Sequence, residues 1–346
     1  MSLRLAIPDL ISPSYFPAIA AVEMGFFEKE GFAATLELLY PVTRTYEELR
    51  EGRLDFVGGA AHAALYAFKD WKGGKLLCAL AQHMYWFLVL RKDINARRGD
   101  LSAVKGLRIG AAPGPVDGLK RMLQRAGIDP ARDVSIGPVP GAAGEKASFG
   151  LMAAQALEAG KIDGFWANGM GAEVAVRNRI GTLVLDARRD GSSEVKGYTF
   201  PALVTTEKQD PKAAAAAIRA VAAAQKALKE DPDRATAVGR KLFPPTEAGL
   251  IAELIRRDLP FYDPAISKQT VASMNRFAQD IGLLSGQVPY ENVVWKPRGS
   301  AEKSRSSPAR AAASARRWRR ASGKTARPSL SPIFAITTSR LARSPR

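Results

Sequence analysis

Short apolar strands alternate with helical stretches through the first part of the chain. Leu3, Leu5 and Ile7 recur at every second position, which is typical of a half-buried strand, and Pro17 follows at the start of a helical pattern. The next elements that the same periodicities predict are strands at 35–40 and 54–57 and helices at 45–51 and 62–71. The first part therefore has the strand–helix order of β/α units.

A second run of the same kind begins near residue 107. The pattern there predicts strands at 107–109, 134–136, 162–166 and 183–185, and helices at 117–126, 153–159 and 172–177. Strands that alternate with helices form parallel pairs, and the helices cover both faces of the sheet. The chain is therefore predicted to be an α/β protein with two similar lobes, each built on a largely parallel sheet.

The two runs share a short sequence at one joint. Residues 49–55 read Leu-Arg-Glu-Gly-Arg-Leu-Asp, and residues 157–163 read Leu-Glu-Ala-Gly-Lys-Ile-Asp. In both, a glycine stands where a helix can end in a left-handed residue before a buried strand begins. The repeated joint, with the same order of elements around it, favours two similar lobes.

The chain is predicted to pass between the lobes twice. The apolar segment 86–90 is typical of a strand leaving the first lobe, and 199–204 of one returning to it. An alanine-rich helix then begins at Asp210 and runs to about residue 229, where it would pack on the first lobe. The predicted boundaries are 1–90 with 198–296 for lobe one, 91–197 for lobe two and 297–346 for a tail.

Charge is spread unevenly along the 346 residues. The formal net charge is +17, but residues 297–346 hold 13 of the 51 Lys and Arg and one of the 34 Asp and Glu, so the tail carries +12 and the rest +5. We expect this basic tail to be disordered, as an accessory extension or as the product of a shifted reading frame. Specific nucleic-acid binding by the folded body is not indicated, because its charge is ordinary.

Three further features bear on the compartment and the core. No apolar stretch reaches the about 18 residues of a transmembrane helix. The N-terminus has no pattern of a secretory signal, so the sequence either begins at the mature domain or belongs to a cytoplasmic protein. The single cysteine, Cys78, cannot form an intramolecular disulfide, and its apolar neighbours predict a buried core position.

Three short segments are characteristic of one family. Residues 12–18 read Ser-Pro-Ser-Tyr-Phe-Pro-Ala, residues 23–32 read Glu-Met-Gly-Phe-Phe-Glu-Lys-Glu-Gly-Phe, and Leu-x-x-Gly-x-Leu-Asp-Phe follows at 49–56. In these segments the chain resembles the ABC-transporter substrate-binding proteins for nitrate, sulfonates, taurine and thiamine precursors.

That resemblance implies a type II periplasmic-binding-protein fold, in which two α/β lobes joined by a two-strand hinge enclose the ligand. It implies a solute-binding protein, not an enzyme, that captures a small organic molecule without a cofactor and delivers it to a permease and ATPase complex. It also implies a periplasmic location, although the absence of a signal sequence leaves the cytoplasm open. We expect a monomer.

Loops after the predicted strands supply the candidate binding residues, because ligands of open α/β sheets lie beyond the carboxyl ends of strands. In lobe one, Ser12, Ser14 and Tyr15 bring hydroxyls to a helix N-terminus, where they would hold an anion or polar group, or simply cap the helix. Gly59 allows close approach of the backbone, and His62 is either a ligand contact or a core residue.

The segment before the hinge and the loops of lobe two complete the set. Gln82, His83 and Tyr85 combine polar groups with aromatic faces, which suits a planar organic ligand. The resemblance implies a Ser or Thr for an anionic ligand in the loop that contains Pro113 and Gly114. This loop has no hydroxyl, and the departure argues against nitrate or a simple sulfonate and leaves backbone N–H groups as donors.

The last candidates follow the strand predicted at 162–166. Trp166 and Asn168 lie at its carboxyl end, and Asn168 either reaches the ligand across the cleft or forms an Asn-Gly turn. The ligand itself is expected to be a small organic molecule with a planar or carboxylate part.

The main alternative is a cytoplasmic enzyme of the same fold, acting in menaquinone or thiamine-precursor metabolism. The sequence has two histidines and one cysteine, and it contains no H-E-x-x-H, G-x-S-x-G or Cys/His cluster that would indicate a metal site or a nucleophilic triad. An acid–base role for His62 or His83 stays open. The glycines at 106, 110, 114 and 118 recur every four residues, which is not a dinucleotide-binding spacing.

Overall fold

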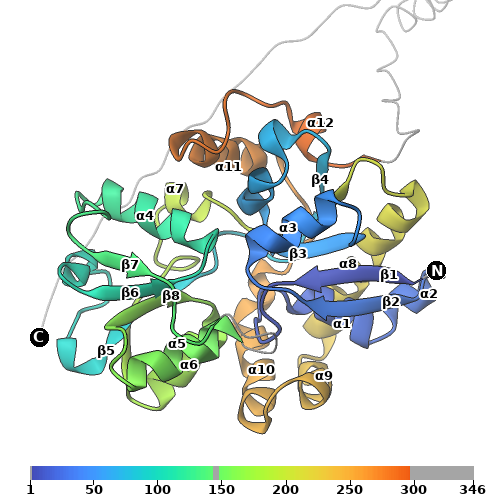
Figure 1. The fold of residues 1–346 in the computed structure, drawn as a ribbon. Helices are drawn as coiled ribbons and strands as arrows, with labels where there is room; N and C mark the ends of the chain where they lie inside the picture. Colours follow the sequence, from blue (N-terminus) through green and yellow to red (C-terminus); the bar gives the residue numbers. More distant parts are fainter. Residues whose placement is uncertain (1, 143–147, 297–346) are drawn as a thin grey trace, which may run out of the picture. The chain divides into compact units, whose positions relative to one another are not determined.

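The computed structural model describes residues 2–142 and 148–296, and within them the chain forms two five-stranded sheets (Figure 1). The first sheet has the order β2-β1-β3-β10-β4 and contains β1 (Leu3–Ile7), β2 (Ala34–Leu38), β3 (Phe56–Ala60), β4 (Gly74–Ala79) and β10 (Pro201–Thr206). The second has the order β7-β6-β8-β5-β9 and contains β5 (Phe87–Arg91), β6 (Arg108–Ala111), β7 (Ser135–Gly137), β8 (Gly164–Ala167) and β9 (Gly181–Asp186). The tail predicted to be disordered, 297–346, lies outside the described residues.

The two sheets have the same topology. In each, three strands pair in parallel, and the fourth in order runs antiparallel to both of its neighbours. That antiparallel strand is β10 in the first sheet and β5 in the second, the strands at which the chain passes between the lobes. The predicted α/β fold with two similar lobes is confirmed, and each largely parallel sheet includes one antiparallel strand.

The position of β5 corrects one predicted boundary. The segment 86–90 was expected to be the last strand of lobe one, which placed the boundary at residue 90. Strand β5 instead pairs with β8 and β9 of the second sheet. Periodicity identifies a buried strand but not its sheet, so the first passage between the lobes lies before Phe87.

Helices cover both sheets. Their bounds are α1 (Phe16–Glu23), α2 (Phe26–Lys29), α3 (Val42–Arg50), α4 (Pro115–Arg125), α5 (Phe149–Glu158), α6 (Gly169–Arg177), α7 (Ser193–Lys196), α8 (Pro211–Glu230), α9 (Arg234–Leu242), α10 (Pro245–Asp258), α11 (Lys268–Asp280) and α12 (Tyr290–Val293). The expected alanine-rich helix is α8, whose first turn is capped by Asp210 accepting from the Lys212 N–H at 3.0 Å. No helix in the described ranges has the length and apolar character to cross a membrane.

The segment 62–71 is not the α-helix that its pattern predicted. It forms two short 3₁₀ turns, Ala61–Tyr66 and Lys69–Trp71. Asp70 and Trp71 have positive φ values of 53° and 61°, and such left-handed residues cannot continue a right-handed helix.

The repeated joint occupies equivalent places in the two lobes, between α3 and β3 and between α5 and β8. Gly52 and Gly160 both have a positive φ, at 75° and 65°. The aspartates that close the two motifs make the same bond, because Asp55 Oδ2 accepts from the Arg4 N–H at 2.8 Å and Asp163 Oδ2 from the Arg108 N–H at 3.0 Å. The two carboxylates thus hold β1 to the start of β3 and β6 to the start of β8.

Candidate functional site

A cavity lies between the two lobes, at the carboxyl ends of strands from both sheets. Its volume is about 40 Å³, enough for about three water molecules. Drug-sized ligands occupy pockets of about 300 Å³ or more, so the lobes are drawn together around little free space. The cavity is lined by Pro8, Asp9, Tyr15, Tyr40, Val42, Tyr85, Trp86, Ala112, Pro113, Pro115, Phe149, Trp166, Ala167 and Asn168.

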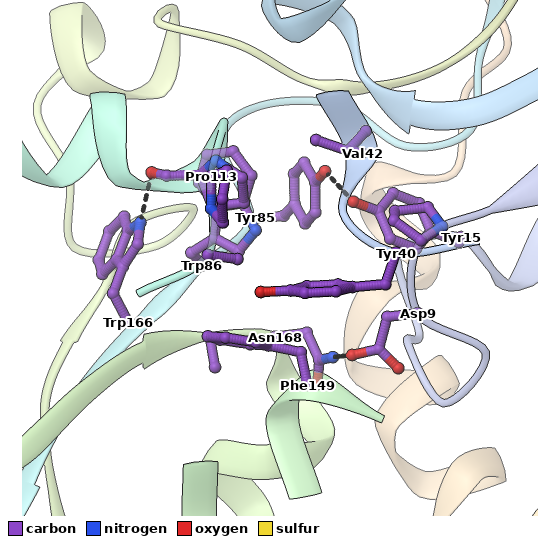
Figure 2. Close-up of a pocket in the computed structure, with 14 residues that line it drawn as sticks. Asp9, Tyr15, Tyr40, Val42, Tyr85, Trp86, Pro113, Phe149, Trp166 and Asn168 are labelled. Atoms are coloured by element: carbon purple, nitrogen blue, oxygen red, sulfur yellow. Dashed lines mark hydrogen bonds between the residues drawn. The ribbon is translucent and has the colours of Figure 1, made fainter. Parts of the chain in front are cut away.

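The walls of the cavity are mainly aromatic (Figure 2). Tyr40, after β2 in lobe one, stacks on Phe149, at the start of α5 in lobe two, with ring centroids 5.9 Å apart and planes 15° apart. Trp86 and Trp166 lie farther along the wall with centroids 6.1 Å apart. Flat apolar surfaces from opposite lobes therefore face each other across the cavity.

Asp9 is the only charged side chain among the described residues that line the cavity. It follows β1 and is 5% exposed. One oxygen accepts from the Ile11 N–H at 3.0 Å and the Ser148 hydroxyl at 2.8 Å, and the other from the Gly150 N–H at 3.4 Å and the Asn168 amide. Three of these four donors belong to lobe two, so Asp9 is a polar link between the lobes.

Burial controls the acidity of this part of the cavity. Desolvation raises the pKa of Asp9 and outweighs the hydrogen bonds from Ser148 and its other donors, which act in the opposite direction. Burial and the negative charge of Asp9 also raise the pKa of Tyr40 to about 12. Both groups thus favour their uncharged forms more than they would in water.

Wild-type protein is expected to lose stability relative to an Asp9→Asn variant as pH rises. The folded state binds the Asp9 proton more tightly than the unfolded chain, so the resulting stabilisation is complete below pH about 4 and is lost as pH rises through the raised folded pKa. We expect the unfolding free energy of wild type to fall relative to that of the Asp9→Asn variant between pH 4 and pH 7, measured by urea denaturation.

Asp93→Asn is the matched control for this measurement. The exposed Asp93 carboxylate accepts from Arg91, and this hydrogen bond lowers the pKa of Asp93, so the dependence on pH should be small and of opposite sign. Equal pH profiles for wild type and the Asp9→Asn variant would contradict the expectation.

Two tyrosine hydroxyls meet at the lobe-one side of the cavity. The hydroxyls of Tyr15 and Tyr85 are 2.6 Å apart, and both rings are buried. Burial is the main reason that both phenols have a raised pKa. The pair is therefore a neutral hydrogen-bonding group that can donate as well as accept.

The structure brings five of the twelve predicted site residues to this cavity, namely Tyr15, Tyr85, Pro113, Trp166 and Asn168. Trp166 donates its indole N–H to the Pro115 carbonyl at 3.0 Å. Asn168 caps α6, with its side-chain oxygen accepting from the N–H groups of Met170 and Gly171, and donates to Asp9. In place of the Asn-Gly turn, Asn168 is thus a helix cap that also forms a contact between the lobes, and its contact with a ligand stays a prediction.

The predicted hydroxyls of Ser12 and Ser14 are buried but do not line the cavity. Ser14 accepts from Arg188 at 3.3 Å, so it belongs to a polar cluster behind Tyr85. Gly59 lies under α3, where an added Cβ would approach the Tyr46 hydroxyl to 2.8 Å. These positions serve packing around the cavity.

His62 is fully buried between the lobes. Its Nδ1 lies 2.9 Å from the Thr199 hydroxyl, and its Nε2 lies 3.2 Å from the Gly114 carbonyl oxygen and 3.4 Å from the Asp117 carboxylate. Gly114 and Asp117 belong to lobe two. His62 is therefore a second polar contact between the lobes, placed beside the cavity and not on its wall.

Gln82 and His83 lie farther from the cavity. The Gln82 amide donates to the carbonyls of Asp263 and Ala265, both at 2.9 Å. His83 has a positive φ of 67° and packs against Phe261 with ring centroids 6.1 Å apart. Partial burial, aided by the nearby charge of Arg188, lowers the pKa of His83.

The sequence did not single out Asp9, Tyr40 or Phe149. Asp9 and Tyr40 each lie two residues beyond a strand of the first sheet, so the rule that ligands lie at carboxyl ends of strands could have found them. Phe149 follows Ser148 at the start of α5, and no local pattern distinguishes it from a core residue.

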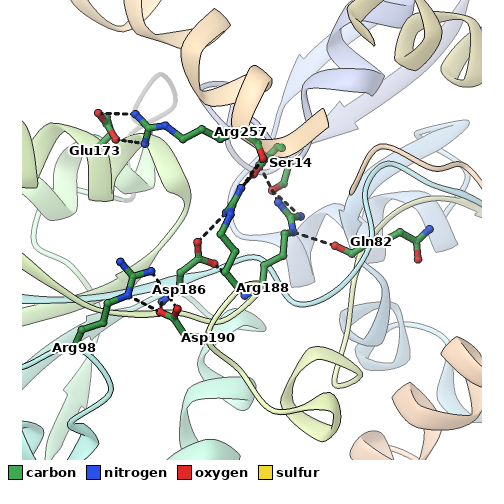
Figure 3. Close-up of polar contacts among 10 residues, drawn as sticks. Ser14, Gln82, Arg98, Glu173, Asp186, Arg188, Asp190 and Arg257 are labelled. Carbon is green, nitrogen blue, oxygen red and sulfur yellow. Dashed lines mark hydrogen bonds and ion pairs between the residues drawn. The ribbon is translucent and has the colours of Figure 1, made fainter. Parts of the chain in front are cut away.

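A buried ion-pair cluster joins the lobes behind the cavity (Figure 3). Arg188, after β9, is 1% exposed and donates to the Asp258 carboxylate at 2.8 Å, the Gln82 carbonyl at 3.0 Å and the Ser14 hydroxyl at 3.3 Å. Arg189 also donates to Asp258, at 2.8 Å. The cluster therefore connects the second sheet with α10, the crossover and the loop before α1.

Comparison with known proteins identifies the family. The sequence profile of the NMT1-like family matches residues 11–241, which include every strand except β1 and every residue that lines the cavity except Pro8 and Asp9. The chain belongs to the NMT1-like family. No curated protein matches this NMT1-like chain.

Solved structures share the fold of the NMT1-like chain at low sequence identity. The alkanesulfonate-binding protein SsuA of Xanthomonas axonopodis, bound to MOPS, superimposes with a TM-score of 0.64 at 15% identity, covering 85% of this chain and 98% of its own. The nitrate-binding protein NrtA of Synechocystis gives a TM-score of 0.58 at 14% identity over 84% of this chain and 92% of its own. The type II periplasmic-binding-protein fold predicted from the sequence is confirmed.

An enzyme has the same fold. The desulfurization enzyme DszB matches with a TM-score of 0.58 at 15% identity, covering 84% of this chain and 95% of its own. The fold alone therefore does not separate binding from catalysis. In the NMT1-like chain Cys78 lies in β4, away from the cavity wall, and burial raises the pKa of its thiol to about 12.

Proposed function

We propose that this chain is a periplasmic solute-binding protein that captures a small organic molecule between its lobes and delivers it to the permease and ATPase of an ABC importer. The observation that carries the proposal is the aromatic cavity, whose walls come from both lobes and whose single carboxylate, Asp9, bonds to donors of both. Membership of the NMT1-like family supports it.

The proposed mechanism is closure driven by contacts to both lobes. When the lobes separate, Asp9 keeps the Ile11 N–H of its own lobe and loses the donors at Ser148, Gly150 and Asn168. A ligand that bonds to Asp9 and stacks on lobe two restores the lost interactions and shifts the population toward the closed form. A ligand that contacts one lobe equally in both states would shift nothing.

Small-angle scattering with and without ligand tests this mechanism. A ligand at about 100 times its dissociation constant should add roughly 2.7 kcal/mol of stability, so thermal shift can first select a ligand from a chemical panel. We expect the radius of gyration to fall when the selected ligand is added, and the ligand to be recovered chemically unchanged. Tight binding without compaction would contradict the mechanism.

A second candidate is an enzyme on the same fold. It is favoured by Asp9, a carboxyl group with a raised pKa in an aromatic cavity, since such groups commonly serve as general acids or bases. Prolonged incubation of a bound ligand, followed by mass spectrometry, separates the two functions. Conversion of the ligand that is lost in an Asp9→Asn variant would favour the enzyme, and its unchanged recovery favours the transport receptor.

A further inference from the structure

We infer that the ligand of this cavity is a planar aromatic or heteroaromatic compound with an N–H donor and no negative charge, selected by Asp9; this rests on the proposed binding function. Neighbours of the same fold are described as binding sulfonates and nitrate, which are anions. The cavity of this chain is instead lined by a carboxylate, Asp9, which suits a ligand without a negative charge. Three observations on lobe two and one on the cavity walls support the inference.

The N-terminus of α5 is the first observation. Helix N-termini attract anions because their unpaired N–H groups and the helix dipole are positive. Here the protein's own carboxylate takes that place, since Asp9 accepts from the Gly150 N–H in the first turn and from the hydroxyl of Ser148, the N-cap residue. An anionic ligand would have to displace Asp9 from these donors.

The N-terminus of α6 is also occupied. Asn168 is its N-cap, and its side-chain oxygen accepts from the Met170 N–H at 3.0 Å and the Gly171 N–H at 3.2 Å. The Asn168 amide that faces the cavity donates to Asp9. The first turn of α6 therefore has no vacant donor for an anion at these two positions.

The N-terminus of α4 is unsuited to an anion for a different reason. Pro113 and Pro115 line the cavity there, and proline has no N–H to donate. The Val116 N–H is bonded to the Ala112 carbonyl, and Asp117 adds a negative charge in the first turn. The backbone donors that the sequence suggested for this loop are thus largely absent.

The walls of the cavity specify the shape of the ligand. Among the described residues the lining includes no Lys or Arg, and its six aromatic rings come from both lobes. Tyr40 and Phe149 already stack nearly parallel, so parting the lobes slightly leaves a slot in which a flat ring can lie between them. At the end of this slot Asp9 accepts hydrogen bonds and favours a donor or a cation.

Three probes of the same shape but different charge test which ligand charge the site prefers. Benzamidine is a cation with N–H donors, benzamide is neutral with an N–H donor, and benzoate is an anion. We expect the full-length protein to bind benzamidine and benzamide at least tenfold more tightly than benzoate, measured by calorimetry at pH 7. Benzoate binding as tight as benzamidine binding would overturn the inference.

The Asp9→Asn variant tests the role of the carboxylate. Its ratio of benzamidine to benzoate affinity should fall at least tenfold, whereas the ratio should be unchanged in Asp93→Asn, which removes the same charge from an exposed position of lobe two. If Asp9→Asn does not fold, the wild-type order of the three probes decides. Absence of binding by all three probes would also overturn the inference.

The outcomes for the inference and for the proposed function are distinguishable. If benzoate binds preferentially and scattering shows compaction, the binding function stands and the inferred ligand class fails. If benzamidine binds preferentially but is converted chemically, the ligand class stands and the transport function fails.

Discussion

Replacing Arg188 with methionine should lower the free energy of unfolding by about 3 kcal/mol. The guanidinium is buried and holds together Asp258, the Gln82 carbonyl and the Ser14 hydroxyl, which come from three separate segments. Removing one partner of a buried ion pair leaves the other charge without compensation, at a typical cost of about 3–5 kcal/mol. We expect the lower end of that range, because Asp258 keeps Arg189 as a partner. Urea denaturation at pH 7 measures the change.

Arg98→Met is the control for Arg188→Met. Arg98 donates to Asp190 at 2.9 Å, but its side chain is 55% exposed, and exposed ion pairs contribute about 0–1 kcal/mol. If both variants lost the same stability, burial of the Arg188 cluster would not be the cause. A loss below 1 kcal/mol in Arg188→Met would also contradict the expectation.

Replacing Gly171 with alanine is expected to destabilise lobe two by about 3 kcal/mol. Helix α6 crosses α5 at this glycine, where an added Cβ would lie 2.4 Å from the Gly150 carbonyl oxygen and 2.7 Å from its carbonyl carbon. These are backbone atoms, so the helices must move apart to relieve the contact. Because Gly150 and Asn168 at the same crossing both donate to Asp9, ligand affinity should also fall.

Gly249→Ala is the matched control, because it makes the same substitution in another helix. No atom lies within 4 Å of the Cβ that would be added at Gly249, which lies in the interior of α10. Alanine is the better helix former by about 0.5–1 kcal/mol, so this variant should gain stability in thermal or urea denaturation. A loss of stability in Gly249→Ala equal to that in Gly171→Ala would show that the crossing is not responsible.

Periodicity predicted most of the fold because most elements obey local rules. The β/α order, the alanine-rich helix that begins after Asp210 and the repeated joint at 49–55 and 157–163 all depend on residues close in sequence. The failures depend on contacts with distant residues. The helix predicted at 62–71 is replaced by two 3₁₀ turns, and the left-handed residues Asp70 and Trp71 bond to Ser285 and Asn275. The sheet that β5 joins is fixed by its pairing with β8 and β9.

The candidate site could be predicted in part. The rule for carboxyl ends of strands directed attention to Tyr15, Trp166 and Asn168, which line the cavity. The rule could not distinguish them from Ser12 and His62, which lie in similar loops. In the structure Ser12 is buried away from the cavity wall, and His62 forms a polar contact between the lobes. The stacking of Tyr40 on Phe149 joins segments far apart in sequence, and so it required the structure.

The placement of β10 has a consequence for the order in which the chain can fold during synthesis. The second sheet is contiguous in sequence from Phe87 to Asp186, so all its strands are available once β9 has left the ribosome. In the first sheet β10 (Pro201–Thr206) pairs with both β3 and β4, so these two strands stay unconnected until β10 is synthesised. The lobe that begins the sequence therefore completes its sheet last, and until then β3 and β4 have unpaired edges of the kind that invite aggregation.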